Sequence, residues 1–287
     1  MRYMALSALF FSLMSMLVKL AGRTFPTMEL VFARAVVVSL LAFAEMRRRR
    51  VSLRNPDIGL LLFRGGLGLA ALTCFYYAVI HLPLAEATVI HFTNPVWTAL
   101  IAAVFLSEAL RPRELAVALG SLTGVVLVVR PFGVLGGSGL VLEPKAVLAA
   151  LAGAVLSAGA YTLVRRLRHH DAMLVVFSFA AVSVVGGFPL MLPSFVWPHD
   201  LDWLLLLGVG LATFFGQVTL TLGLQRERAG PATAIGYLQI VFAAIWGALV
   251  FGDAVRLTTT CGAAVVVACT LLLAHLRRRE PVPPGDE

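Results

Sequence analysis

The stretch IGLLLFRGGLGLAALTCFYYAVI at residues 58–80 carries a single charged side chain, Arg64, among 23 residues. A helix of about 20 apolar residues is long enough to cross the hydrocarbon core of a bilayer, so this stretch predicts a membrane-spanning helix. Nine other stretches have the same character, although the first and fifth are short. The ten predicted spans are residues 4–20, 28–46, 58–80, 85–106, 115–129, 146–164, 173–192, 203–224, 231–251 and 259–276. The sequence therefore predicts an all-α polytopic membrane protein with ten transmembrane helices.

The composition of the whole chain excludes the main soluble classes. Of its 287 residues, 60% are hydrophobic and 13% are charged, whereas soluble domains are about 45–50% apolar and about 25% charged. A particle of this size has too much surface to hide such an excess. A soluble enzyme, a disordered chain and a secreted disulfide scaffold are thus excluded. The three cysteines lie inside apolar runs without metal-ligand spacing, and we interpret them as small core residues.

The net charge of +8 comes from arginines that gather in alternate loops between the predicted spans. One set of loops, with the C-terminal tail, contains Arg47, Arg48, Arg49, Arg50, Arg54, Arg111, Arg113, Arg165, Arg166, Arg168, Arg226, Arg228, Arg277, Arg278 and Arg279. The opposite loops contain far fewer: Lys19 or Arg23, Arg130, Lys145 and Arg256. Basic loops stay on the cytoplasmic side, so we expect a multi-pass protein of the inner membrane with both termini in the cytoplasm. The arginine clusters are then topological signals, and no nucleic-acid partner is expected.

The two halves of the chain are similar at a constant shift of 145 residues. Ala87-Thr88 falls on Ala232-Thr233, and Glu108-Ala109-Leu110-Arg111 falls on Asp253-Ala254-Val255-Arg256. We therefore predict a first repeat at residues 1–130, a linker at 131–145, a second repeat at 146–276 and a cytoplasmic tail at 277–287. Because each repeat would contain five spans, an odd number, the two repeats would have opposite orientations in the membrane. Inverted repeats are typical of secondary transporters, in which two halves move about a shared central site.

Several motifs resemble those of one known family. They are Leu62-Phe63-Arg64-Gly65-Gly66, Phe75-Tyr76-Tyr77-Ala78, Leu82-Pro83-Leu84-Ala85-Glu86-Ala87-Thr88, Asn94-Pro95-Val96, Phe105-Leu106-Ser107-Glu108, Ala229-Gly230-Pro231-Ala232 and Phe251-Gly252-Asp253-Ala254. Together they resemble the drug/metabolite transporter superfamily, specifically its EamA-type members, over essentially the whole chain. The resemblance implies ten helices and alternating access for small organic solutes. The chain departs from the family at Ile240, which stands where the family has a proline in the ninth helix.

Polar groups at membrane depth are the candidate site residues, because burying them in lipid is unfavourable. Arg34 lies about 12 Å inside its predicted helix, where it can offer a positive charge to a carboxylate or phosphate of a substrate. The alternative is that Arg34 pairs with a helix-end carboxylate or carbonyl and stabilises packing. Arg64 lies about 9 Å from its helix start, close enough to snorkel to the membrane surface, so we interpret it as structural.

The fourth predicted span contains a second group of candidates around Pro95. A proline removes a backbone hydrogen bond, and interrupted helices often carry transporter sites. His91 and Asn94 lie beside it, and the shift of 145 places Tyr237 and Gln239 at the matching depth of the ninth span. The alternative for any single aromatic residue is a place in the core or at the membrane interface. The predicted substrate-binding residues are Arg34, Tyr76, His91, Asn94, Trp97, Gln217, Tyr237 and Gln239.

The sequence thus predicts a secondary transporter, and by resemblance an exporter, of small organic metabolites such as amino acids or related compounds. We expect transport to occur by exchange or facilitated diffusion, or to be coupled to protons through His91, because histidine is the one deep side chain whose ordinary pKa is near neutral. The alternatives are a solute channel and, more remotely, an intramembrane enzyme, although paired aspartates and an HExxH motif are missing. No catalytic residue, metal or cofactor is expected. The expected partners are a small organic solute and the lipid bilayer, with a homodimer left open.

Overall fold

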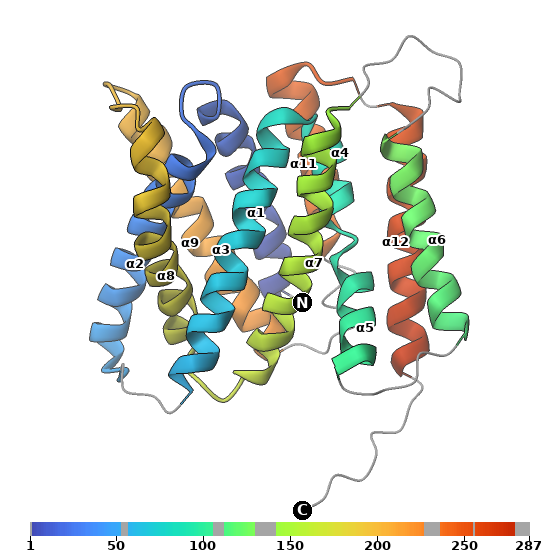
Figure 1. Cartoon of the computed structure of the whole chain (residues 1–287), viewed down its shortest axis with the longest axis horizontal. Helices are drawn as coiled ribbons and strands as arrows, with labels where there is room; N and C mark the ends of the chain where they lie inside the picture. The colour runs from blue at the N-terminus through green and yellow to red at the C-terminus, as the bar shows by residue number, and fades with distance from the viewer. Residues whose placement is uncertain are drawn as a thin grey trace, which may run out of the picture.

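The computed structural model describes residues 2–52, 57–105, 112–129, 142–226, 236–254 and 256–278. Within these ranges the chain is helical and contains no strand (Figure 1). The helices are α1 (Arg2–Ala21), α2 (Thr27–Arg49), α3 (Ile58–His81), α4 (Leu84–His91), α5 (Asn94–Phe105), α6 (Pro112–Val129), α7 (Pro144–Arg166), α8 (Ala172–Met191), α9 (Asp202–Arg226), α11 (Leu238–Trp246) and α12 (Leu257–Arg278), with a 3-10 turn η1 (Leu192–Ser194) and a π-helical segment η2 (Gly247–Phe251).

Six of these helices are long and apolar enough to cross a membrane. They are α1, α2, α3, α7, α8 and α9, with mean hydropathy between 1.8 and 2.1. Large apolar side chains such as Leu40, Val185 and Leu204 are 65%, 75% and 64% exposed on the surface of the bundle. An apolar surface of this kind is stable in contact with the hydrocarbon core of a bilayer. The chain is therefore an α-helical polytopic membrane protein, as the sequence predicts.

The other four predicted spans coincide with different structural elements. Residues 85–106 fall on α4 and α5, 115–129 on α6 and 259–276 on α12. The ninth span falls on α11 and η2 from residue 238 onward, and its first residues lie outside the described part of the chain. That these four segments also cross the membrane stays a prediction. Glu108 and most of the predicted linker also lie outside the described residues.

The fourth predicted span is broken in the middle, where the sequence places a proline. Helix α4 ends at His91, and α5 begins at Asn94 with Pro95 in its first turn. Proline is favoured in a first turn because it has no N–H to donate. The hydroxyl of Thr93 donates to the carbonyl of Ile90 at 2.8 Å. The break therefore has local hydrogen-bonding partners that hold it.

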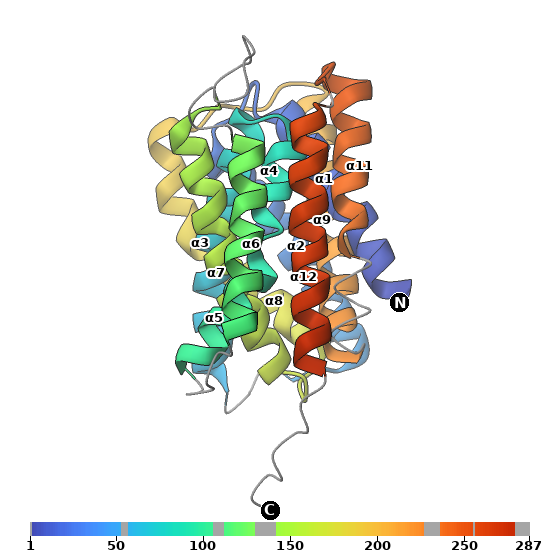
Figure 2. The ribbon, with the colours of Figure 1, turned by 90° about the vertical axis from the view of Figure 1, so that its right-hand side faces the viewer.

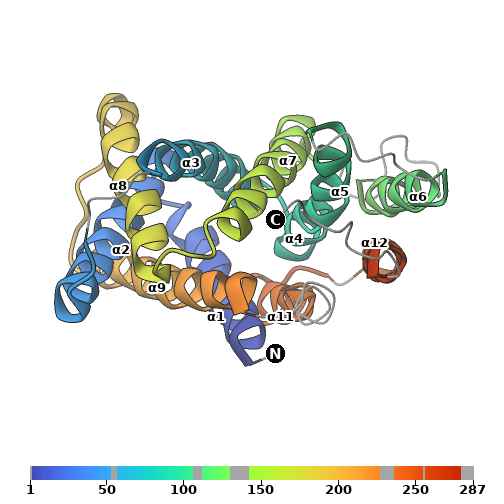
Figure 3. The same cartoon turned by 90° about the horizontal axis from the view of Figure 1, so that it is seen from below.

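The helices pack in antiparallel and crossed pairs that bring distant parts of the sequence together. Helix α3 lies against α7, α1 against α9, α2 against α8, α4 against α11, and α6 against α12. Figure 2 shows α6 and α12 side by side, and Figure 3 shows this pair at one end of an elongated bundle, with α2 and α8 at the other. Helix α3 also lies against α8, and α2 against α9, and small residues allow these helices to approach closely: a Cβ on Gly65 would lie 2.8 Å from Val182, and one on Gly210 would lie 2.5 Å from Val37.

Candidate substrate-binding site

Two arginines and one phenylalanine form the most unusual cluster in the membrane-spanning part of the chain. The guanidinium carbon of Arg34, on α2, lies 4.8 Å from the ring centroid of Phe179, on α8. The guanidinium carbon of Arg64, on α3, lies 4.2 Å from the same centroid. Both distances are within the range of a cation–π interaction. One ring therefore brings two positive charges together.

These two arginines are as buried as aliphatic core residues. Arg34 is 1% exposed and Arg64 is 2% exposed. Among the residues that the structure describes, Nε and Nη2 of Arg34 and Nε and Nη1 of Arg64 have no hydrogen-bond partner. Buried donors without partners, and buried charges without counter-ions, are strongly unfavourable in proteins. The cluster therefore presents unused hydrogen-bond donors and positive charge in the interior.

Neighbouring residues hold the cluster in place. A Cβ on Gly68 would lie 2.6 Å from Cε2 of Phe179, so the ring occupies space that only a glycine leaves open on α3. Tyr76, which is fully buried, lies near Arg34, and Tyr161 on α7 lies near Arg64. The cluster is thus built by α2, α3, α7 and α8.

The predicted residue His91 lies in a separate buried contact at the end of α4. Its ring packs on Phe75 with centroids 4.4 Å apart, and its Nε2 lies 3.4 Å from Oγ of Ser157 on α7. Its Nδ1 is buried without a hydrogen-bond partner among the described residues. The imidazole is thus hydrogen-bonded through Nε2 and not through Nδ1 in this part of the chain.

Helix α4, from the fourth predicted span, lies against α11, from the ninth. The rings of Phe92 and Tyr237 lie 5.4 Å apart between centroids. Asn94 and Gln239 are 7% and 8% exposed. The structure therefore brings Arg34 close to Tyr76, and the His91 region close to Tyr237 through Phe92.

Two predicted site residues, Trp97 and Gln217, form hydrogen bonds only with residues of their own segment in the described part of the chain. The indole N–H of Trp97 donates to the hydroxyl of Thr93 on the previous turn at 3.1 Å, which is a contact within its own segment. Gln217 on α9 is 5% exposed, and its backbone carbonyl accepts a hydrogen bond from Thr221. Neither contact assigns a ligand, so their roles stay predictions.

Sequence reasoning missed two members of the cluster, Arg64 and Phe179. The expectation that Arg64 would snorkel to the membrane surface is wrong, because its guanidinium group turns inward onto Phe179. Phe179 has no distinguishing feature in an apolar helix, but it stands 145 residues after Arg34. That coincidence was a usable signal. The proposed pairing of Arg34 with a helix-end carboxylate is not found among the described residues.

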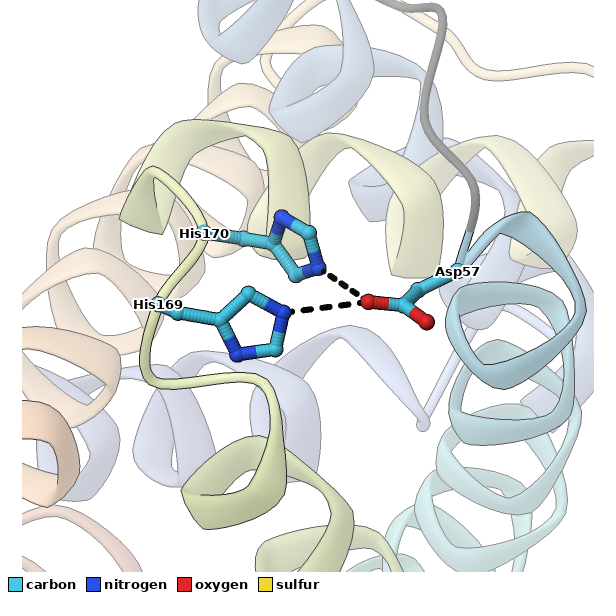
Figure 4. Close-up of side chains that lie close together, drawn as sticks. All are labelled: Asp57, His169 and His170. Carbon is cyan, nitrogen blue, oxygen red and sulfur yellow. Dashed lines mark hydrogen bonds and ion pairs between the residues drawn. The ribbon is translucent and has the colours of Figure 1, made fainter.

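A different cluster links two connections at one end of the bundle. Nε2 of His169 and Nε2 of His170 lie 3.0 Å and 2.8 Å from Oδ2 of Asp57 (Figure 4). The hydrogen bonds from His170 and His169 hold the pKa of Asp57 below its usual range. Two imidazoles and a carboxylate within 4.8 Å of one another are also a donor set that suits a divalent transition metal. No local sequence pattern indicates this cluster, because Asp57 and the histidines are far apart in the chain.

A polar network connects α1, α4 and the residues just after η2 at the opposite end of the bundle. Nζ of Lys19 donates to the carbonyl of Leu82 at 2.8 Å and to Asp253 at 3.2 Å. Asp253 also accepts from the backbone N–H of Leu84 at 3.2 Å. Asp253 therefore links the end of α1 to the start of α4.

A polytopic helical membrane protein with unpaired polar groups buried between its helices has the character of a solute transporter. Comparison with known sequences gives the family. The profile of the EamA-like transporter family matches residues 1–130 and 144–274, and the chain belongs to this family, which is part of the drug/metabolite transporter superfamily. It is a membrane transporter and not an enzyme.

Individual relatives agree with this assignment. The chain is 36% identical over 271 residues to the pseudopaline exporter CntI of Pseudomonas aeruginosa, with 93% of each protein covered. It is 31% identical over 278 residues to human solute carrier family 35 member G1, covering 93% of this chain and 76% of the human protein. A solved crystal structure has the same fold, with a TM-score of 0.61, 23% identity and coverage of 95% of this chain and 98% of the other.

Proposed function

We propose that the chain is a secondary transporter that exports small organic metabolites, such as amino acids or related compounds, across the inner membrane. Two five-helix repeats of opposite orientation would alternate the access of a central site between the two sides. The proposal combines the family with the internal repeat and with the polar groups buried between the halves.

The observation that carries the proposal is a pair of equivalent contacts. Gly65 packs on Val182, and Gly210 packs on Val37. A shift of 145 residues converts Gly65 to Gly210 and Val37 to Val182, so each contact is the counterpart of the other. Helix pairs follow the same rule, since the pairing of α3 with α7 corresponds to that of α9 with α1. This pattern is what a two-fold relation between two inverted repeats predicts.

The polar groups lie close to the expected symmetry axis. Residues that are equivalent by a two-fold operation contact each other only near its axis. Phe92 and Tyr237 are such a pair, and so are Arg34 and Phe179. Transporter sites lie at the interface between repeats near the bilayer midplane. These contacts therefore support a central substrate site that includes Arg34, Tyr76, His91, Asn94, Tyr237 and Gln239.

The direction of transport and the topology are inferred from a relative and from the charges of the loops. A relative with 36% identity is named an exporter, and the arginine-rich loops favour a cytoplasmic location for both termini. Export from the cytoplasm across the inner membrane is consistent with both.

Counterflow in proteoliposomes tests the proposed mechanism. Vesicles with purified protein are loaded with an unlabelled metabolite, and entry of the same labelled metabolite is followed over a panel of amino acids and organic acids. We expect saturable uptake with a transient overshoot for at least one metabolite. Linear, non-saturating flux without overshoot would favour a channel, and absence of flux over the whole panel would contradict transport of this class.

The same vesicles test coupling. An imposed proton gradient should change the flux in the original protein, and His91→Ala should abolish that change if His91 carries the proton. Full proton dependence in His91→Ala would exclude His91, and no proton dependence in the original protein would favour exchange or facilitated diffusion. Thr162→Ala, on α7, is a suitable control because the hydroxyl of Thr162 donates to the carbonyl of Ala158 in its own helix.

A further inference from the structure

We propose that Arg34 and Arg64 bind the two acid groups of a small organic dianion, a dicarboxylate, beside Phe179. The inference rests on the proposed function, since it names the class of solute that the central site would carry. It adds Arg64 and Phe179 to the candidate site residues. It also narrows the proposed substrate class from organic metabolites in general to those with two acid groups.

The first argument is the missing counter-charge. Two guanidinium groups share one ring in the interior, and among the described residues neither has a carboxylate partner. Each of the two buried acids of the described helices binds another group. Oε2 of Glu29 accepts from the backbone N–H of Val196, although Oε1 of Glu29 has no hydrogen-bond partner among the described residues, and Oε1 of Glu86 accepts from the hydroxyl of Thr259. Two like charges at membrane depth are unfavourable unless an anion balances them.

The second argument is the geometry of the unused donors. Nε and Nη2 of Arg34 form one edge of its guanidinium group, and this edge can hold both oxygens of one carboxylate. Nε and Nη1 of Arg64 provide two more donors. Because both groups lie on one ring, the two charges are at most about 9 Å apart. A single carboxylate satisfies one such edge, whereas a short dicarboxylate reaches both groups.

The third argument is the asymmetry of the charges. The positions equivalent to Arg34 and Arg64 in the second half are Phe179 and Val209. If this cluster served only to pack the two repeats together, two charged side chains in one repeat and none at the equivalent positions of the other would have no purpose. Both charges come from the first half and meet on the ring supplied by the second half, so the charge faces the interface where a solute would move.

Binding by the purified protein tests the class of ligand without any variant. The thermal unfolding of the detergent-solubilised protein is measured with malonate, succinate, glutarate or adipate, with the matching diamides, and with inorganic phosphate. We expect at least one dicarboxylate to raise the unfolding temperature in a saturable manner, while its diamide does not. Equal stabilisation by diamides, stabilisation by phosphate but by no dicarboxylate, or no effect of any dicarboxylate would overturn the proposal.

Variants then test the two arginines. Arg34→Gln and Arg64→Gln should each weaken the apparent affinity for the stabilising dicarboxylate by at least about tenfold, because each removes a charge-assisted contact. Arg166→Gln removes an exposed arginine at the end of α7 and should leave affinity within about twofold. If a glutamine variant does not fold, Arg64→Lys retains the charge and should still lose affinity, because lysine lacks the planar fork of donors. Unchanged affinity in folded variants would overturn the assignment.

Flux measurements separate this inference from the proposed function. Counterflow of a neutral amino acid that dicarboxylates do not inhibit, and that survives Arg34→Gln and Arg64→Gln, would leave the transporter intact and overturn the dianion site. Dicarboxylate binding that depends on both arginines, without flux of any solute, would support the site and contradict transport. Counterflow of the dicarboxylate itself supports both.

Discussion

The rings of Phe92 and Tyr237 lie 5.4 Å apart, and the two residues occupy equivalent positions in the two halves of the chain, 145 residues apart. The contact joins α4 to the beginning of α11. It lies beside the break between α4 and α5, where the backbone departs from a continuous helix. The contact is therefore one of those that join the first half of the chain to the second.

Adding a methyl or larger group to either of two equivalent glycines should destabilise the protein to a similar extent. Gly65→Val would press on Val182, and Gly210→Val on Val37. Overpacking of this kind is unfavourable by about 1–3 kcal/mol, and thermal unfolding monitored by tryptophan fluorescence measures it. Gly66→Ala is the control, because nothing lies within 4 Å of its added Cβ. In the double variant Gly65→Val with Val182→Ala, the smaller side chain at 182 should restore part of the lost stability. A double variant as unstable as Gly65→Val alone would show that the contact with Val182 is not the cause.

Gly68→Ala should displace the ring of Phe179 and with it both guanidinium groups. The added Cβ would lie 2.6 Å from Cε2 of Phe179, and an aromatic ring cannot yield as a flexible chain does. We expect a several-fold loss of solute affinity and a smaller loss of stability, measured by ligand-dependent thermal shift. Affinity equal to that of Gly66→Ala would show that the position of the ring is unimportant.

The contact between Lys19 and Asp253 should stabilise one end of the bundle. Both side chains are largely buried, at 14% and 25% exposed, and hydrogen bonds to charged groups contribute about 1.5–3 kcal/mol. Lys19→Met and Asp253→Asn should each lower the unfolding temperature, and the double variant should lose less than the sum of the two. Strict additivity in this cycle would mean that the two side chains do not interact in solution.

Acid should weaken the link that Asp57 makes with His169 and His170. The pKa of Asp57 is lowered from its usual value of 3.8 by these hydrogen bonds, so the folded state favours the carboxylate. The contribution of Asp57 to the free energy of unfolding is therefore complete above the pKa that Asp57 has in the unfolded chain. This contribution is lost as the pH falls below about 4 and passes through the lower pKa of Asp57 in the folded state. Unfolding temperatures measured from pH 6 to about pH 3 should fall less steeply in Asp57→Asn than in the original protein. Parallel curves for the two proteins would contradict the link.

The break in the fourth span could be predicted because its cause is local. Pro95 cannot donate a hydrogen bond wherever it stands, and α5 begins immediately before it. The burial of Asn94 and Gln239 could be predicted for a related reason, since both lie within long apolar stretches. In contrast, the link between Asp57 and His170 joins two connections separated by more than a hundred residues, and no local pattern indicates it.

Arg64 marks the limit of sequence reasoning at the candidate site. The position of Arg64 within α3 is as predicted, but position alone allows the long side chain to turn toward either the membrane surface or the interior. Packing of α8 against α3 decides the direction, because Phe179 fits over Gly68 and offers its ring to the guanidinium group.

The amino-acid sequence by itself determined that this protein is a helical bundle in a membrane and where its long apolar helices run, because about 20 consecutive apolar residues have no other favourable surroundings. The tertiary structure alone decided which charged groups remain without partners. Hydrophobic length is a property of each segment taken singly, whereas the meeting of Arg34 and Arg64 on one ring depends on how three helices pack.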